Sequence, residues 1–183
     1  MNTILPRIKK HFDALQDRLL CFREQEVQVE GWFKGEMLFL LSGLKREGVI
    51  EGFGREAGNQ QGRTKVDLTI ALGGSTHWIE LKHWLVGVER GARLDPPFYF
   101  GDPTSVGIVK DFDKLVAVAS EAPKWFLILL TGNPGSELWE KGLARFHRKF
   151  TPRKLLSLST PKEFPAAYFL GLLGTRCDEL RGA

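Results

Sequence analysis

The chain has 183 residues, a length that suits one domain over 1–183 and would be cramped for two. Apolar residues make up 43% of it and charged residues 26%, which is typical of a water-soluble globular protein, and no apolar run is long enough to span a bilayer. We therefore expect a cytoplasmic protein that does not enter the membrane. The net charge of +4 permits a polyanionic partner such as nucleic acid but does not require one.

Several familiar catalytic and cofactor-binding patterns are absent from the sequence. Cys21 and Cys177 match no metal-binding or redox spacing, so we interpret them as reduced, packed thiols. There is no histidine pair at zinc-binding spacing, no serine nucleophile elbow and no phosphate-binding loop, and the glycines from Gly52 to Gly58 miss the dinucleotide-binding spacing. These absences argue against zinc enzymes, serine hydrolases and nucleotide-binding folds.

Two segments near the start of the chain have the apolar spacing of amphipathic helices. The first has Pro6 near its first turn and is interpreted as one packing helix. Its apolar residues are Ile8, Phe12, Leu15 and Leu19. The second ends near Gly48 and carries Glu36 at the edge of its apolar stripe. That stripe consists of Phe33, Met37, Leu40, Leu41 and Leu44.

The next elements are interpreted as three strands. Residues 49–53 form a short strand, and 54–63 form a polar, glycine-bearing connection. From 65 to 72 apolar and polar residues alternate, which is the period of a strand with two unlike faces. Gly73–Gly74 offers a hairpin turn, and the return strand runs over 76–84.

This hairpin places Asp67, Glu80 and Lys82 on one face of the sheet. With a two-residue turn Asp67 faces Glu80, and with a four-residue turn it faces Lys82. In either register the two carboxylates are close enough to share one hard cation, which would remove their mutual repulsion. The lysine could neutralise charge on a phosphate as an ammonium group or, with a lowered pKa, help to deprotonate water.

The second half of the chain contains further helical and strand segments. Residues 87–107 form a long connection rich in glycine, proline and aromatic residues, which we expect beside the site. A helix over about 105–121 ends before Pro123, and a buried strand follows over 124–131. Beyond it we expect a helix over 136–150, a strand over 155–158, and a strand or helix over 166–173.

The order of these elements and the charged residues that they carry resemble the PD-(D/E)xK nuclease superfamily. The resemblance covers about 31–131 and implies an α/β, restriction-endonuclease-like fold with an αβββαβ core and a mixed central sheet flanked by helices. It implies that Asp67 and Glu80 are metal ligands and that Lys82 is the catalytic lysine. It also implies that Glu36 is an accessory acid. Val66 stands where many members have proline, and this difference removes no ligand.

The resemblance further implies a Mg²⁺-dependent nuclease that hydrolyses phosphodiester bonds in nucleic acid. Mn²⁺ is the expected substitute ion, and DNA is favoured over RNA as the substrate. Two other interpretations stay open. The same fold could be a catalytically silent module that binds nucleic acid or a protein partner, or the charged strand could be the solvated surface of a structural subunit.

Other residues have both a functional and a structural interpretation. Lys110 and Lys114, four residues apart on the later helix, either contact phosphates or face solvent. The aromatic residues at 98–100 either stack on bases or pack within their loop. His77 and His83 share the strand face opposite to the site, so we predict structural roles for both.

Overall fold

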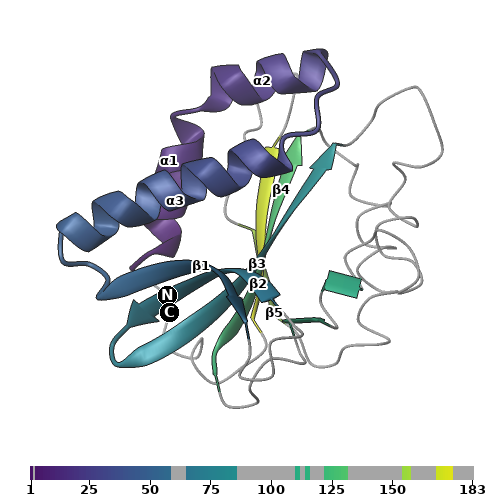
Figure 1. The fold of residues 1–183 in the computed structure, drawn as a ribbon. Coiled ribbons are helices and arrows are strands. Elements are labelled where there is room, and N and C mark those ends of the chain that lie inside the picture. Colours follow the sequence, from purple (N-terminus) through teal and green to yellow (C-terminus); the bar gives the residue numbers. More distant parts are fainter. Residues whose placement is uncertain are drawn as a thin grey trace.

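The computed structural model describes residues 1, 3–58, 65–85, 110–111, 114–115 and 122–131, and the backbone of 154–157 and 168–174 (Figure 1). The predicted connection over 87–107, its aromatic residues, the helix over 136–150 and Cys177 lie outside these ranges. Cys21 is an exposed free thiol, so its interpretation as a packed thiol is wrong.

Helices occupy the first part of the chain, but the first predicted helix is divided in two. It is interrupted after Asp13, where the N–H of Leu15 bonds the carbonyl of Phe12 in a tighter turn. The prediction of one helix through Leu19 is therefore wrong. The apolar spacing does not reveal the interruption because Phe12 and Leu19 are buried in the same core. The helices are α1 (Leu5–Asp13), α2 (Gln16–Glu24) and α3 (Glu30–Arg46).

Helix α3 is the amphipathic helix that the sequence predicts. Four of its five stripe residues are buried, and Leu40 is half-buried. Gly48 follows the helix with a φ of 73°, and its N–H bonds the carbonyl of Lys45 at 3.1 Å. A glycine at this point costs little because it adopts the left-handed conformation freely.

The strands form one mixed sheet in the order β1-β2-β3-β4-β6-β5. The central pair β3–β4 is parallel, and every other neighbouring pair is antiparallel. The predicted strands over 124–131 and 155–158 are confirmed, the latter shifted by one residue, and the segment near 166–173 is a strand. The strands are β1 (Gly52–Gly58), β2 (Lys65–Leu72), β3 (Ser75–Leu85), β4 (Lys124–Thr131), β5 (Lys154–Ser157) and β6 (Tyr168–Gly174).

Strand β1 lies later in the chain than the sequence predicts. The predicted strand over 49–53 is correct only at 52–53, and the predicted connection over 54–63 is wrong up to residue 58, because β1 begins at Gly52 and continues through it. Among the described strands, β1 lies at one edge of the sheet and pairs only with β2. An edge strand does not require the alternation of apolar and polar residues that identifies a buried strand. The glycines and charged residues of β1 therefore have the composition of a loop.

The β2–β3 hairpin has a two-residue turn. Leu72 pairs with Ser75, and the central residues Gly73 and Gly74 have φ values of 59° and 70°. Positive φ at both central positions is characteristic of a type I′ turn, which glycine adopts without steric cost. The shorter of the two predicted turns is therefore correct, and the four-residue register is wrong.

The helices pack against one face of the sheet, with α1 and α3 on the same side (Figure 1). Every residue of β4 is buried, so Phe126, Ile128 and Leu130 are enclosed on the opposite face. A central strand covered on both faces is typical of α/β proteins. The sheet residues that join the helices in one core are Leu68, Ile70, Ile79, Leu81, Trp125, Leu127 and Leu129.

Candidate functional site

Asp67 and Glu80 lie side by side where the β2–β3 pairing ends. The register of the hairpin runs from Leu72–Ser75 to Leu68–Ile79. One step beyond, the backbone N–H of Asp67 donates to Glu80 Oε2 at 3.3 Å, and the N–H of Leu81 donates to Asp67 Oδ2 at 2.9 Å. If the strands continued to pair, these two backbone N–H groups would donate to backbone carbonyls. Here they donate to the carboxylates, and the two hydrogen bonds hold both side chains in place.

Glu80 is the most enclosed acidic group of the site, with 4% of its side chain exposed. Burial raises its pKa to about 7, and the negative charge of Asp67 acts in the same direction. A hydrogen bond from Lys114 opposes both effects without cancelling them. An ionised Glu80 therefore needs more positive charge nearby than the described side chains supply.

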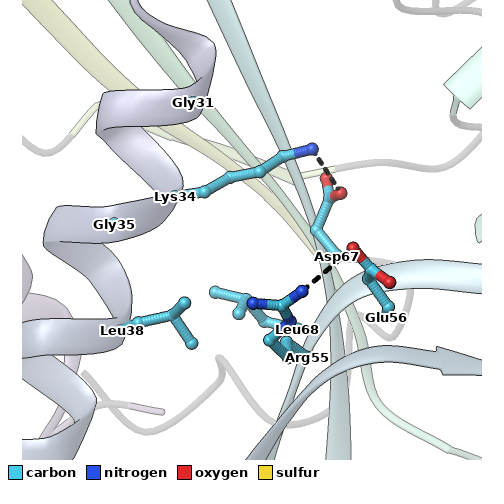
Figure 2. Close-up of a pocket in the computed structure, with 8 residues that line it drawn as sticks. All are labelled: Gly31, Lys34, Gly35, Leu38, Arg55, Glu56, Asp67 and Leu68. Carbon is cyan, nitrogen blue, oxygen red and sulfur yellow. Dashed lines mark ion pairs between the residues drawn. The ribbon is translucent and has the colours of Figure 1, made fainter.

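Two lysines from separate elements pair with the two carboxylates. Lys34 of α3 places its Nζ 2.8 Å from Asp67 Oδ1 (Figure 2). Lys114 pairs with Glu80 Oε1 from a segment in which residues 110–111 and 114–115 are helical. The sequence leaves open whether Lys114 faces solvent or contacts phosphates. In the structure its ammonium group pairs with an acid of the site.

Lys82 is on the same sheet face, but its ammonium group pairs with other acids. Its Nζ is 2.8 Å from Asp111 Oδ2 and 3.5 Å from Glu30 Oε2. Burial alone would lower the pKa of Lys82, but the hydrogen bond to Asp111 and the charges of Asp111 and Glu30 outweigh it and raise the pKa. Lys82 is therefore a stable cation, and the alternative of a lysine with a lowered pKa is wrong.

Glu36 lies away from these residues, contrary to its predicted role as an accessory acid. Its carboxylate contacts His11 Nε2 at 3.0 Å and Arg18 Nη1 at 3.4 Å, on α1 and α2. Two residues correspond to about 200° around a helix axis, so Lys34 and Glu36 point to opposite sides of α3. The acidic residue of α3 that pairs with lysines of the network is Glu30, which contacts both Lys34 and Lys82.

Three charged residues of the network, Glu30, Lys34 and Asp111, are not predicted from the sequence, and a phosphate contact is only one of two alternatives for Lys114. Their spacing nevertheless carries a signal. Glu30 and Lys34 are four residues apart on α3, and Asp111 and Lys114 are three residues apart and each at a helical position. Such spacings place two side chains on the same helical face. The spacing indicates which residues share a helical face, but it does not predict which strand that face contacts.

A cavity of about 280 Å³ opens beside Asp67 (Figure 2). Two cations and two acids line it, and ion pairs join Lys34 to Asp67 and Arg55 to Glu56, so the charges of the lining balance. Gly31 and Gly35 border it from α3, and a Cβ at either position would meet no atom within 4 Å. The remaining lining residues are Leu38, Glu56, Asp67 and Leu68.

The residues present fit a magnesium site better than a zinc site. Within the described ranges no three His, Cys, Asp or Glu side chains gather as a metal-binding group. Mg²⁺ does not need such a cage, because it usually keeps several waters and binds through one or two carboxylates together with substrate phosphates. Asp67 and Glu80 supply two carboxylates of this kind, and the raised pKa of Glu80 marks a place where added positive charge is favourable.

The two histidines of β3 are structural, in agreement with the sequence-based interpretation. His77 Nδ1 accepts a hydrogen bond from Trp125 Nε1 at 2.9 Å. His83 Nδ1 accepts from the N–H of Val29 at 3.3 Å, and its Nε2 lies 2.9 Å from Thr131 Oγ1. Burial lowers the pKa of His83 to about 4, so its ring is neutral near pH 7.

Comparisons of the chain with models of known families, with curated proteins and with solved structures each found no match. Among the described residues, no helix has both the length and the apolar character needed to cross a membrane. The function is therefore inferred from the chain's own residues.

Proposed function

We propose that the protein is a Mg²⁺-dependent nuclease with a restriction-endonuclease-like core, acting on nucleic acid and on DNA in preference to RNA. One observation carries the proposal. Asp67 and Glu80 lie side by side, held by backbone N–H groups at 3.3 Å and 2.9 Å, at the point where two strands stop pairing. Fixed carboxylates of this kind can bind an ion without paying to order their side chains first.

The order of elements supports the same fold assignment. Helix α3 is followed by β1, β2 and β3, then by helical residues within 110–115 and by β4. This is the αβββαβ order that the resemblance implies. The sheet is mixed, and the acidic pair lies on the two strands that the resemblance assigns to it.

Each residue of the proposed site has a distinct task. Asp67 and Glu80 would hold Mg²⁺, which when bound supplies Lewis-acid polarisation of the phosphate and an activated water. Lys82 stays protonated because Asp111 and Glu30 flank it, so it can neutralise charge that develops on the scissile phosphate.

The direct test is incubation of the purified chain with single-stranded and double-stranded DNA and RNA, with Mg²⁺, Mn²⁺ or a chelator. We expect at least one substrate to be cut with either ion and none to be cut in chelator. Cleavage that persists in chelator would reject the metal-dependent mechanism. If every substrate stays intact while nucleic acid binds with strong salt dependence, the protein is a binding module.

A binding-only function is favoured by a separate pocket of about 420 Å³ between α1 and α3. It is lined by Arg7, Lys10 and Arg46, and Lys10 and Arg46 have no acidic partner in the part of the chain that the structure describes. Phe39 borders it with 69% of its surface exposed. Basic side chains around an exposed aromatic ring suit a single-stranded nucleic acid. Phe39→Ala should then weaken single-strand binding without reducing its salt dependence.

A further inference from the structure

The carboxylates of Asp67 and Glu80 are each paired with one lysine, and the two lysines come from separate parts of the chain. Lys34 approaches Asp67 from α3, and Lys114 approaches Glu80 from the later helical segment. Both lysine side chains are about a third exposed, at 39% and 34%, whereas the carboxylates are 13% and 4% exposed. The lysines are therefore the partners that can move, because the carboxylates are also held by backbone N–H groups.

The charges of the network make such movement favourable when a divalent ion arrives. Four carboxylates, at 30, 67, 80 and 111, face three ammonium groups, at 34, 82 and 114. Four negative and three positive charges leave one net negative charge when all are ionised. A divalent ion changes this to one net positive charge, which disfavours ammonium groups at the carboxylates and favours a phosphate anion.

We propose that Lys34 and Lys114 are internal counter-cations that a divalent ion displaces from Asp67 and Glu80. The displaced ammonium groups then neutralise the phosphates of the bound nucleic acid. The inference rests on the proposed function and names the residues that set the ion affinity of that site. It accounts for the presence of two lysines in addition to Lys82, whose ammonium group has acidic partners of its own.

The test is calorimetric titration of Mn²⁺ into the full chain and into Lys34→Met, Lys114→Met and the double variant. Each single variant should bind Mn²⁺ about fivefold more tightly, because the ion no longer competes with an ion pair. The double variant should bind more tightly still. At saturating Mn²⁺ all three should cut nucleic acid more slowly than the wild type, because phosphate charge is less well neutralised.

The matched control is Lys45→Met. Lys45 is an exposed lysine in the last turn of the same helix as Lys34, and its removal changes the net charge by the same amount. We expect its Mn²⁺ affinity and cleavage rate to equal those of the wild type. An equal gain in affinity in the control would mean that net charge alone is responsible, which would overturn the inference.

The remaining outcomes separate the inference from the proposed function. If the wild type binds Mn²⁺ and cuts nucleic acid but neither site variant binds more tightly, the lysines are ordinary ion-pair partners and only the inference fails. If the wild type binds no ion but the double variant does, the two lysines hold the carboxylates without being displaced, so both the displacement and the metal-dependent activity are rejected. If no variant binds Mn²⁺, both are rejected.

Discussion

His83 and Glu80 lie on opposite faces of β3, and burial displaces the pKa of each by a similar amount. The ring of His83 is enclosed by Thr131, the backbone of Val29 and the amide of Gln28, so neutral groups satisfy it. Glu80 is enclosed by the charges of Asp67 and Lys114. A buried group with neutral partners, such as His83, keeps its protonation state near pH 7. The protonation state of a buried group with charged partners, such as Glu80, changes when another ion binds nearby.

The two faces of the hairpin therefore have different tasks. On the helix-covered face, apolar residues pack against α1 and α3, and His77 and His83 have hydrogen-bond partners. On the other face, a network of acids and lysines includes a carboxylate whose pKa is raised to about 7. Perturbed acids that are grouped with other charges are more typical of functional sites than of packing. Variants on the two faces should accordingly affect different measurements.

The largest effect should follow from Asp67→Asn and Glu80→Gln. Each removes a proposed ligand, and Lewis-acid catalysis is worth several kcal/mol, so cleavage should fall at least about 1000-fold. In the wild type, Mn²⁺ at about 100 times its dissociation constant should stabilise the fold by about 2.7 kcal/mol and raise the melting midpoint by about 5 to 10 °C. Both variants should lose most of this shift, and a full shift in both would place the ion elsewhere.

Lys82→Met should separate ion binding from turnover. Loss of a cation that neutralises phosphate charge should slow cleavage by about 100-fold or more. The Mn²⁺-dependent rise in melting midpoint should stay the same or increase, because Lys82 contacts Asp111 and Glu30 and a nearby positive charge is lost. Single-turnover cleavage at saturating Mn²⁺ measures the first effect. A variant that cuts at the wild-type rate would remove Lys82 from the mechanism.

The pH dependence of stability in chelator should distinguish the two faces directly. The folded protein holds the pKa of His83 at about 4, below its unfolded value near 6.5, so His83 costs stability as pH falls through this range. Glu80 has the opposite sign, because its pKa rises from about 4.5 in the unfolded chain to about 7, and its contribution is lost as pH increases. The contributions of His83 and Glu80 to the pH dependence of the unfolding free energy have opposite signs and largely cancel in the wild type.

Single variants should reveal how each residue alone changes the unfolding free energy with pH. From pH 4.5 to 6.5, the unfolding free energy of His83→Gln should decrease relative to the wild type by about 2 to 3 kcal/mol, and that of Glu80→Gln should increase by a similar amount. Urea denaturation at several pH values measures both. Parallel pH profiles for the two variants would contradict the contrast between the faces.

The smallest effect should come from Glu36→Gln. Its carboxylate pairs with His11 and with the exposed Arg18, and such pairs contribute under about 1 kcal/mol. Cleavage should stay within about twofold of the wild type, and the Mn²⁺-dependent shift should be unchanged, because Glu36 points away from the strand residues. A large loss of cleavage without a loss of stability would restore the accessory role that the sequence predicts.

The fold was predictable wherever the sheet imposes a strong pattern. The alternation over 65–72 and the continuous apolar run over 124–131 identify strands at the centre of the sheet. The edge strand β1 was misplaced because one neighbour and an exposed edge impose little pattern. The interruption between α1 and α2 was missed because hydrophobic spacing records burial and not backbone continuity.

The site was predictable only where it depends on local geometry. A two-residue turn fixes the facing of Asp67 and Glu80, so the acidic pair follows from the sequence near it. The acid of α3 that meets the strand residues is Glu30 and not the predicted Glu36, because this depends on how α3 is rotated about its axis against the strands. The pairing of Lys114 with Glu80 joins residues 34 apart and depends on tertiary packing.

The central claim, that a divalent ion binds between Asp67 and Glu80, is tested most directly by a crystal of the wild-type protein soaked in Mn²⁺. Its anomalous scattering locates the ion without reference to activity. We predict one strong peak within about 2.1 Å of a carboxylate oxygen from each residue, with the Lys34 and Lys114 ammonium groups withdrawn. A map with no peak between these two carboxylates, or with its strongest peak at other residues, would contradict the account.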